Sequence, residues 1–407
     1  MNYEGDNMSG VRKSNRAAVL CCLHENGGLS RKKLAETLGL TQAAMTKIVS
    51  ELLSEGLLTE GDSVPSPGAG RREVTLTLEA RSRCALGVFL GLGGAVLSGV
   101  RLDGSVAFSE TVPLPQCAPA EETVKALAER LTALAEADGL PREQIIGLGV
   151  AVRGTIGADG RSVKSSFNAL DTEDFPICER FEQYTGLRCV LSNNVRALLA
   201  AQLFLDRESG HGSCVFLRCE RGIGAAASLG GSIWEGERRQ CAEIGHIPVV
   251  RRGGKPCHCG KTGCLETIAS PSALREDALS LLSPERTPLL WRCAREKGTE
   301  AVTVGDVLEA ARGGDAGAAA VVDRGIEALA DALKSAVYLL DPGRVILYGS
   351  VFEHPYYLSR LRAEMALGVD GQHTLPVEKS SRNGLLENAA AGILAAERFL
   401  KNGGSAL

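Results

Sequence analysis

The feature that most constrains the fold of this chain is a hairpin pattern that occurs twice. Residues 86–110 read as a strand, a glycine turn, a strand, an Asp-Gly turn and a further strand. The pattern returns 127 positions later, where Val88–Leu90 recur as Val215–Leu217, Leu102 recurs as Leu229, and Gly104 and Ser105 recur as Gly231 and Ser232. Similar hairpins can coincide by chance, so the repeat has to be judged by the elements that come after each copy.

Both copies are followed by alternating helical and strand patterns. After the first copy we expect a helix over 121–137, a strand over 145–152, a helix over 175–185, a strand over 188–191 and a helix over 194–204. After the second copy we expect helices near 302–312 and 316–340, followed by a strand over 344–349. The shared continuation predicts two α/β lobes with a cleft between them.

Composition excludes several classes of protein. With 44% hydrophobic and 23% charged residues, the chain has the balance of a folded soluble protein. Its apolar runs, such as 345–347, are far shorter than the ~20 residues of a membrane-spanning helix, and the start MNYEGDNMSG lacks the apolar part of a signal peptide. Ten of the 13 cysteines are scattered and three are clustered. This distribution favours a reducing, cytoplasmic setting with one metal site over a disulfide scaffold.

The start of the chain shows the pattern of a helix-turn-helix. A first helix is expected from an N-cap at Ser14 to a stop at Gly27. A second helix begins after the N-cap Ser30, and a sharp turn at Gly39 leads to a third helix capped by Thr41. In such a unit the second of the two closely joined helices can lie in the major groove of DNA.

A wing comes after the third helix. Leu57 and Leu58 begin a strand, a Pro/Gly loop ends in two arginines, and residues 73–79 return as an alternating strand. Paired arginines suit a narrow minor groove, and the start of the third helix offers donors for base edges and phosphates. The predicted DNA-binding residues are Thr41, Gln42, Thr46, Lys47, Arg71 and Arg72. Because residues 1–80 hold nine Lys/Arg against ten Asp/Glu, the prediction depends on local geometry, and a winged helix that binds another protein is the alternative.

One short motif, CAEIGHIPVVRRGGKPCHCGKTGCLE, predicts a metal site. One imidazole and three thiolates form the ligand set of a closed structural zinc site. The candidate zinc ligands are His246, Cys257, Cys259 and Cys264. Gly260 and Gly263 let the chain fold back so that the last cysteine can meet the others. His258 is the alternative ligand, but its position between two cysteines is expected to turn it away from a metal that both neighbours bind.

These motifs together resemble the ROK family of bacterial sugar-responsive repressors and sugar kinases. The resemblance rests on the helix-turn-helix with its GRR wing, the glycine-rich hairpin, EIGH, CHCGKTGCLE and LDPGRVILYGS, and it extends from about Ser14 to ENAAAGILAA near the C-terminus. It implies an α/β protein in which a winged helix-turn-helix (1–80) precedes a duplicated, actin/hexokinase-like (ribonuclease H-like) two-lobed ROK domain (81–407). In this family a sugar binds between the lobes.

The kinase pattern of the family is altered at four places. Phe89 stands where family kinases have the Asp of a DxGGT phosphate loop, and Glu220 and Arg221 replace the Gly and Thr of a second, GTGIG-like loop. Asn194 replaces the catalytic Asp of an NDAN-like sequence, and an amide nitrogen cannot take a proton from a sugar hydroxyl. Tyr348 lies in the adenosine-side turn, which is GGG-like in the kinases. These departures predict a protein that is not an enzyme.

The sugar side of the family pattern is better matched. The predicted sugar-binding residues are Asn193, Asn194, Glu243, His246 and Glu266. Carboxylate, amide and imidazole groups can hydrogen-bond several adjacent hydroxyls of a polyol. The alternative for Glu243 and Glu266 is that they only orient the zinc ligands. Arg153 replaces the Pro of a Pro-Gly pair in the family, and it either clashes with a sugar or recruits a charged one.

Three functions are compatible with these features. The leading hypothesis is a DNA-binding transcriptional regulator, a repressor of genes for sugar uptake or metabolism, that acts as a homodimer or homotetramer on operator DNA and binds a sugar or sugar derivative without phosphorylating it. The second is an ATP-dependent sugar kinase with a regulatory DNA-binding domain. The third is a regulator controlled by a protein partner. Zinc is the expected cofactor in each case.

Overall fold

The computed structural model describes residues 8–64, 73–166, 169–206, 212–366 and 375–407. Close contacts divide the chain into two units, of which one contains Met1–Gly210 and Leu385–Leu407 and the other contains His211–Gly384. The winged helix and the first lobe thus belong to the same unit. This division does not test the predicted domain boundary between residues 80 and 81, which stays a prediction.

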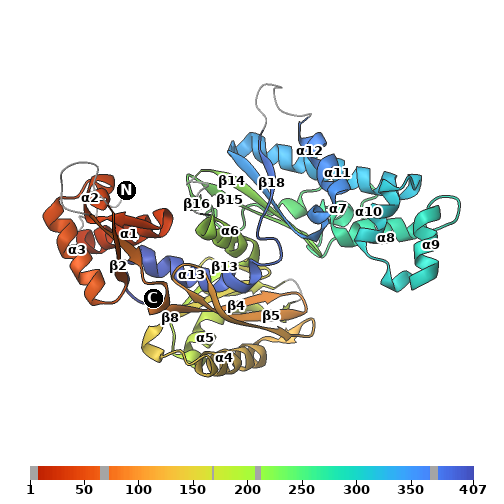
Figure 1. Cartoon of the computed structure of the whole chain (residues 1–407). Helices are drawn as coiled ribbons and strands as arrows, with labels where there is room; N and C mark the ends of the chain where they lie inside the picture. Colours follow the sequence, from red (N-terminus) through yellow and green to blue (C-terminus); the bar gives the residue numbers. More distant parts are fainter. Residues whose placement is uncertain (1–7, 65–72, 167–168, 207–211, 367–374) are drawn as a thin grey trace. The chain divides into compact units, whose positions relative to one another are not determined.

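The winged helix-turn-helix begins the first unit (Figure 1). Its elements are α1 (Met8–Asn26), β1 (Gly28–Ser30), α2 (Arg31–Leu38), α3 (Gln42–Ser54), β2 (Leu58–Val64) and β3 (Glu73–Leu78). The strands form an antiparallel sheet in the order β1-β3-β2. Leu20, Leu34, Met45 and Leu52 are fully buried, so the apolar stripes of the three helices meet in one core.

The predicted ends of α2 and α3 are confirmed. The hydroxyl of Ser30 accepts the backbone N–H of Lys33 at 3.2 Å, and the hydroxyl of Thr41 accepts that of Ala44 at 3.2 Å. Gly39 ends α2 in the left-handed conformation, with φ of 66°. These caps fix the turn that separates the two helices.

The predicted N-cap at Ser14 is wrong. Helix α1 begins at Met8, and Ser14 lies inside it. The additional N-terminal turns carry Arg12, whose Nη2 lies 2.8 Å from Oε2 of Glu51 in α3. A contact with a distant part of the chain therefore accompanies the extension, and local capping preference alone does not reveal it.

The first lobe is a five-stranded sheet in the order β13-β8-β4-β5-β6. Its strands are β4 (Cys84–Gly91), β5 (Gly94–Arg101), β6 (Val106–Pro113), β8 (Ile145–Val152) and β13 (Cys189–Asn193), and shorter pairings are made by β7 (Ala118–Pro119), β9 (Thr155–Ile156), β10 (Val163–Ser165), β11 (Leu170–Asp171) and β12 (Glu173–Phe175). Helices α4 (Ala120–Ala137) and α5 (Ile177–Thr185) cover one face, and α6 (Asn194–Leu205) and α13 (Glu387–Lys401) cover the other (Figure 1). Single 3-10 turns lie at η1 (Ala80–Ser82) and η2 (Arg142–Gln144).

Glycines bring the backbone of α13 against this sheet. A Cβ added at Gly149 of β8 would lie 1.7 Å from the carbonyl oxygen of Ala391, and one added at Gly87 of β4 would lie 2.5 Å from the nitrogen of Gly392. Only glycine permits so close an approach. The C-terminal helix is therefore an integral layer of the first lobe.

The second unit contains a five-stranded sheet in the order β16-β15-β14-β17-β18. Its strands are β14 (Cys214–Cys219), β15 (Ile223–Leu229), β16 (Ser232–Ile233), β17 (Arg344–Tyr348) and β18 (Val377–Lys379). Its helices are α7 (Glu266–Ala269), α8 (Pro271–Ser280), α9 (Pro288–Lys297), α10 (Val304–Arg312), α11 (Ala316–Leu340) and α12 (Pro355–Ala366), with 3-10 turns η3 (Ile244–His246), η4 (Thr299–Ala301) and η5 (Ser350–Glu353). Leu217, Leu329 and Leu347 are fully buried in its core.

The predicted duplication is confirmed by strand order and register. In each sheet an antiparallel hairpin is extended by two parallel strands beyond its first strand. Val88 pairs with Val150 in the first lobe, and its counterpart Val215 pairs with Val345 in the second. The strand predicted over 145–152 and the helix predicted over 316–340 have the observed bounds. The repeat in the sequence thus corresponds to a repeat in topology.

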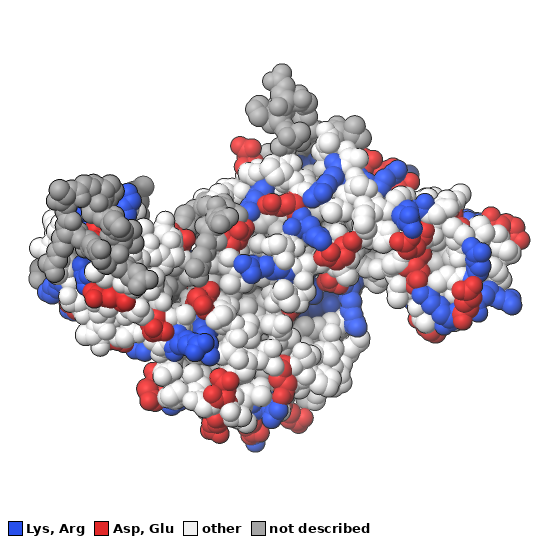
Figure 2. All heavy atoms as spheres, in the orientation of Figure 1, with Lys and Arg blue, Asp and Glu red and all other residues white. Residues whose placement is uncertain are grey.

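Basic and acidic side chains are mixed on the molecular face shown in Figure 2. This agrees with the formal net charge of −4 for the whole chain. Within the described residues, no helix combines the length and apolar character needed to cross a bilayer.

Candidate functional site

Helix α3 presents the predicted DNA-reading residues on its exposed side. Thr41, Gln42, Thr46 and Lys47 are all exposed, whereas Met45, Ile48 and Val49 are buried against the rest of the winged helix. The Thr46 hydroxyl donates to the carbonyl oxygen of Gln42 at 2.8 Å, and the Thr41 hydroxyl caps the helix. The long side chains of Gln42 and Lys47 are therefore the ones with the greatest reach toward a ligand. Arg71 and Arg72 of the wing lie outside the described residues.

The four predicted metal ligands of the second unit lie together. One donor atom from each of His246, Cys257, Cys259 and Cys264 falls within 4.8 Å of all the others. The Cys257 sulfur lies 3.6 Å from Nδ1 of His246, and the sulfurs of Cys259 and Cys264 are 3.6 Å apart. Zinc–sulfur bonds of about 2.3 Å in a tetrahedron place sulfur atoms about 3.8 Å apart. The donor set and its spacing thus fit a four-coordinate zinc ion.

The backbone of the loop brings these ligands together. The N–H of Cys257 donates to the carbonyl oxygen of Lys261 at 2.8 Å, and Pro248 forms an isolated bridge with Cys264. Gly263 has φ of 71°, and a Cβ there would lie 2.0 Å from the carbonyl oxygen of Val250. This glycine is therefore required for the chain to turn back, as the sequence predicts.

His258 lies against Glu266 beside the cysteine cluster. Its Nδ1 is 2.9 Å from Oε1 of Glu266, and its ring meets that of His246 edge-on with centroids 5.0 Å apart. Burial raises the pKa of Glu266 and is the largest single effect on it. The hydrogen bond and charge of His258, the backbone N–H of Ile223 and the charge of His246 together outweigh burial and hold the pKa below its usual value. His246, His258 and Glu266 also bring their donor atoms within 4.8 Å of one another, so His246 belongs to both groups.

Glu266 also holds part of the sheet. Its Oε2 accepts the backbone N–H of Ile223, at the start of β15, at 3.2 Å. Glu243 directly precedes η3, whose last residue is His246. The three predicted sugar-binding residues of the second unit are therefore close neighbours of the candidate zinc loop, and this position fits both a sugar-binding role and a role in orienting the metal ligands.

The other predicted sugar-binding residues lie in the first unit, where β13 ends and α6 begins. Asn193 caps α6 by accepting the N–H of Val195 at 2.9 Å, and its amide donates to the carbonyl oxygen of Gly154 at 2.8 Å. Asn194 is buried in the first turn of α6. Arg153 follows β8, and its backbone N–H donates to the carbonyl oxygen of Leu90 at 3.1 Å. Asn193 thus fixes the loop that carries Arg153.

The turn after β14 and the turn after β17, at which the sequence predicts departures from the kinase pattern, are bonded to each other. The Glu220 carboxylate accepts the backbone N–H of Ser350 at 2.7 Å and the Ser350 hydroxyl at 3.1 Å. Tyr348 is buried and stacks on Phe216 with ring centroids 5.7 Å apart. Phe89 of the first unit is likewise buried in β4. The side chains of Phe89 and Tyr348 are therefore part of the packed interior, and Glu220 joins two turns of the second unit.

Sequence reasoning missed the polar residues that hold these turns. Asn383 accepts the N–H of Gly349 at 2.7 Å and donates to its carbonyl oxygen at 3.1 Å. Asn383 belongs to no motif, and Ser350 ends the motif LDPGRVILYGS without any signal of its partner. Both bond to groups more than thirty positions away in the chain. Only the tertiary structure reveals such pairs.

Two parts of the chain match models of known protein families. The family model described as the ROK family matches residues 87–395, and the MarR family model matches residues 14–63. The DNA-binding transcriptional dual regulator NagC of Escherichia coli K12 is 28% identical over 351 residues, which cover 85% of this chain and 83% of NagC. A glucokinase of Halalkalibacterium halodurans is 29% identical over 210 residues, which cover 52% of this chain and 63% of the kinase.

A solved structure shares the fold over nearly the full length. It is a ROK family transcriptional regulator described as a homologue of the E. coli Mlc protein, with a TM-score of 0.80, 20% sequence identity and coverage of 97% of this chain and 98% of that protein. The match includes both the winged helix and the two lobes, as the sequence resemblance implies. Relatives of this domain include regulators and kinases, so family membership alone does not decide between them. The chain belongs to the ROK family and carries a MarR-like winged helix at its N-terminus.

Proposed function

We propose that this chain is a DNA-binding transcriptional repressor of genes for sugar uptake or metabolism. In this proposal the ROK domain binds a sugar or sugar derivative as an effector and does not phosphorylate it. The protein acts as a homodimer or homotetramer, because two recognition helices are needed to read two half-sites of an operator. Effector binding changes operator affinity by favouring one conformation of the protein over another.

The observation that carries the proposal is the exposed side of α3 within a complete helix-turn-helix. Gln42 and Lys47 project from a helix whose opposite side is buried in the core. Their donors suit base edges and phosphates. NagC, a DNA-binding transcriptional regulator, matches most of this chain and supports the same function.

A duplex-binding assay tests the DNA-binding role. The probe is the DNA upstream of the gene for this chain, titrated at several fixed salt concentrations. We expect the double change Arg71→Ala and Arg72→Ala to weaken binding by about tenfold or more and to reduce its salt dependence. The control is Arg292→Ala with Arg295→Ala, two exposed arginines of α9 in the second unit. Equal binding by both double variants would remove the wing from the interface.

The interaction between Glu220 and Ser350 supports the absence of kinase activity. A carboxylate at this position repels nucleotide phosphates, and it already accepts the Ser350 N–H that a phosphate oxygen would need. Asn194 cannot act as a general base. We therefore expect no ATP-dependent phosphorylation of any hexose in a coupled assay, even after the change Glu220→Gly. Measurable turnover by the unaltered chain would favour the alternative, a sugar kinase with a regulatory DNA-binding domain.

Effector binding needs a separate test. Calorimetry with neutral sugars, amino-sugar derivatives and phosphorylated sugars identifies the class that binds. Arg153, on the loop fixed by Asn193, leads us to expect a preference for an anionic sugar. Binding of none of these ligands by a chain that still binds its operator would favour regulation by a protein partner.

We also propose one structural zinc ion held by His246, Cys257, Cys259 and Cys264. The support is a complete set of one imidazole and three thiolates with tetrahedral spacing. When bound, zinc would tie the two ends of the loop together and stabilise a segment with few buried apolar residues.

A further inference from the structure

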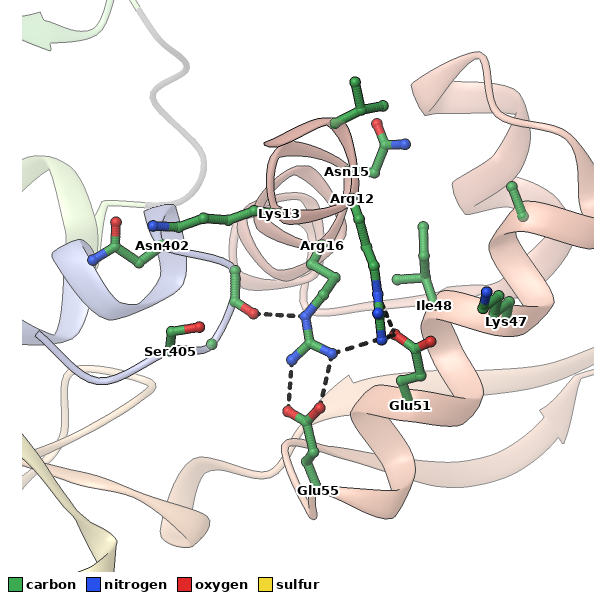
Figure 3. Close-up of a pocket in the computed structure, with 14 residues that line it drawn as sticks. Arg12, Lys13, Asn15, Arg16, Lys47, Ile48, Glu51, Glu55, Asn402 and Ser405 are labelled. Carbon is green, nitrogen blue, oxygen red and sulfur yellow. Dashed lines mark hydrogen bonds and ion pairs between the residues drawn. The ribbon is translucent and has the colours of Figure 1, made fainter. Parts of the chain in front are cut away.

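A groove in the first unit brings α3, the proposed recognition helix, next to the last residues of the chain (Figure 3). The groove has a volume of about 960 Å³ and lies between α1, the side of α3 that includes Ile48 and Glu51, and residues 402–405. The residues after α13 therefore reach the DNA-binding module directly.

One side chain, that of Arg16 in α1, joins all three segments. Its Nε donates to the carbonyl oxygen of Gly403 at 2.9 Å. Its two terminal nitrogens donate to the two carboxylate oxygens of Glu55 at 2.8 and 2.6 Å, and Nη1 lies 3.5 Å from Glu51. Figure 3 shows the guanidinium at the centre of this set. The side chain is only 11% exposed, unlike that of a typical surface ion pair.

The C-terminal segment fits closely against α1. Gly403 and Gly404 have φ of 70° and 83°. A Cβ at Gly403 would lie 2.8 Å from the carbonyl oxygen of Lys13, and one at Gly404 would lie 2.6 Å from Cδ1 of Leu57. Both positions therefore require glycine for the backbone to enter the groove.

The C-terminal segment is attached to the sheet of the first lobe on both sides of the groove. Before it, Ala391 and Gly392 of α13 lie against the glycines of β8 and β4. At its end, the N–H of Leu407 donates to the carbonyl oxygen of Ile146 at 3.3 Å. A second contact joins α1 to α6, where Nε2 of His24 lies 2.9 Å from the carbonyl oxygen of Phe204 and the two rings are 3.9 Å apart.

We propose that Arg16 is a positioning residue through which residues 402–407 hold the recognition helix against the first lobe. The winged helix and the first lobe then act as one body, and the operator is read by a helix whose position the ROK domain sets. Arg16 itself does not contact a DNA base in this proposal. It acts by holding Glu55 and Glu51, at the C-terminal end of α3. The inference rests on the proposed DNA-binding function.

The test uses the full chain and two variants that break the junction from opposite sides. Arg16→Ala removes the guanidinium, and Gly403→Ala displaces the C-terminal segment while leaving every charge in place. We expect both to raise the hydrogen-exchange rates of the α3 amides about tenfold and to weaken operator binding by a similar factor, because charge-assisted hydrogen bonds are lost. A chain that ends at Asn402 should behave in the same way.

Controls separate geometry from charge and from general strain. Arg16→Lys keeps the charge but cannot make the forked contact, so it should not restore α3 protection or operator affinity. Arg130→Ala breaks the exposed pair with Glu110, and Gly139→Ala places alanine at a positive-φ position with nothing within 4 Å. Both should leave α3 exchange and operator binding within about twofold of the unaltered chain.

Two results would overturn the inference. One is unchanged α3 exchange in both Arg16→Ala and Gly403→Ala. The other is an Arg16→Lys chain whose α3 exchange and operator affinity equal those of the unaltered chain. A single positive charge would then be sufficient at this position. If the unaltered chain binds no duplex, the proposed function fails, whereas the exchange measurements still decide whether the junction exists. If Arg16→Ala does not fold, the Gly403→Ala chain and the shortened chain show whether residues 402–407 hold α3.

Discussion

The two lobes share a sheet topology but hold their attached segments by different physical means. In the first lobe, α13 is held by apolar burial and by backbone contact at Gly87 and Gly149. In the second lobe, the loop between β16 and α7 instead gathers a cluster of thiol and imidazole groups. A duplicated scaffold thus carries one segment that is attached by close packing and another that, in our proposal, is tied by a metal ion.

The comparison also separates the roles of the two lobes. The first lobe carries the winged helix and the C-terminal segment that contacts α3. The second carries Glu243, His246 and Glu266 and the two turns joined by Glu220 and Ser350. The sheet register is common to both, so function lies in the segments that each sheet carries.

The largest expected effect is the loss of the metal cluster. We expect Cys257→Ser to lose about one equivalent of zinc and to destabilise the loop by several kcal/mol, because ligand binding and local folding are coupled. Metal analysis of the purified protein checks the first part, and hydrogen exchange of residues 243–266 checks the second. The first lobe should keep its exchange protection.

The control for this change is Cys293→Ser, which alters a half-buried cysteine of α9 outside the cluster. His246→Ala provides a second variant of the cluster. Full metal retention by both Cys257→Ser and His246→Ala would show that the proposed ligand set is wrong. Loss of exchange protection in both lobes would show that the two lobes are not stabilised separately.

A smaller effect is expected from the packing of the first lobe. Gly149→Ala places a Cβ 1.7 Å from a backbone carbonyl of α13, which cannot move without shifting the helix. We expect a loss of about 3 kcal/mol in the free energy of unfolding of the first unit, measured by denaturant titration. The control, Gly305→Ala in α10, has its nearest contact at 3.4 Å from a hydroxyl oxygen and should change stability by less than about 1 kcal/mol. Zinc content should stay the same in both.

Much of the fold can be predicted from the sequence where the signal is local or repeated. Ser30, Gly39 and Thr41 mark helix ends by their own side chains or backbone freedom, and all three are confirmed. The offset of 127 positions identifies equivalent strands because each copy has to build the same hairpin. The four candidate zinc ligands lie within one short motif, so their convergence is also predictable.

The rest depends on distant contacts. Arg16 and Gly403 are 387 positions apart, and no pattern in either segment indicates the other. Likewise, Glu220 is recognisable as a departure from a phosphate loop, but its bond to Ser350 across 130 positions is not predictable. Composition and periodicity describe which face of an element is buried, and they do not specify which polar group meets it.

The smallest expected effect concerns acid stability in the second lobe. Asp306 lies in the capping box of α10, where it accepts the N–H of Thr303 at 2.7 Å, and its carboxylate lies 2.6 Å from Nζ of Lys297. Burial raises the pKa of Asp306, but the hydrogen bonds from Lys297 and Thr303 outweigh burial and hold it at about 2, below its ordinary value of 3.8. A lowered pKa in the folded state means that the ionised form stabilises the fold.

This contribution is fully present above the unfolded pKa near 3.8 and is lost as pH falls through about 2. We therefore expect Asp306→Asn to cost about 1 kcal/mol at neutral pH, with a difference from the unaltered chain that narrows as the pH is lowered from 4. Denaturant titrations at several pH values measure it. Asp331→Asn, at a 77% exposed position of α11, is the control and should change stability by only a few tenths of a kcal/mol at any pH. A difference for Asp306→Asn that stays constant down to pH 2 would assign its cost to lost capping geometry, and the acid response of the second lobe would then have to come from other carboxylates.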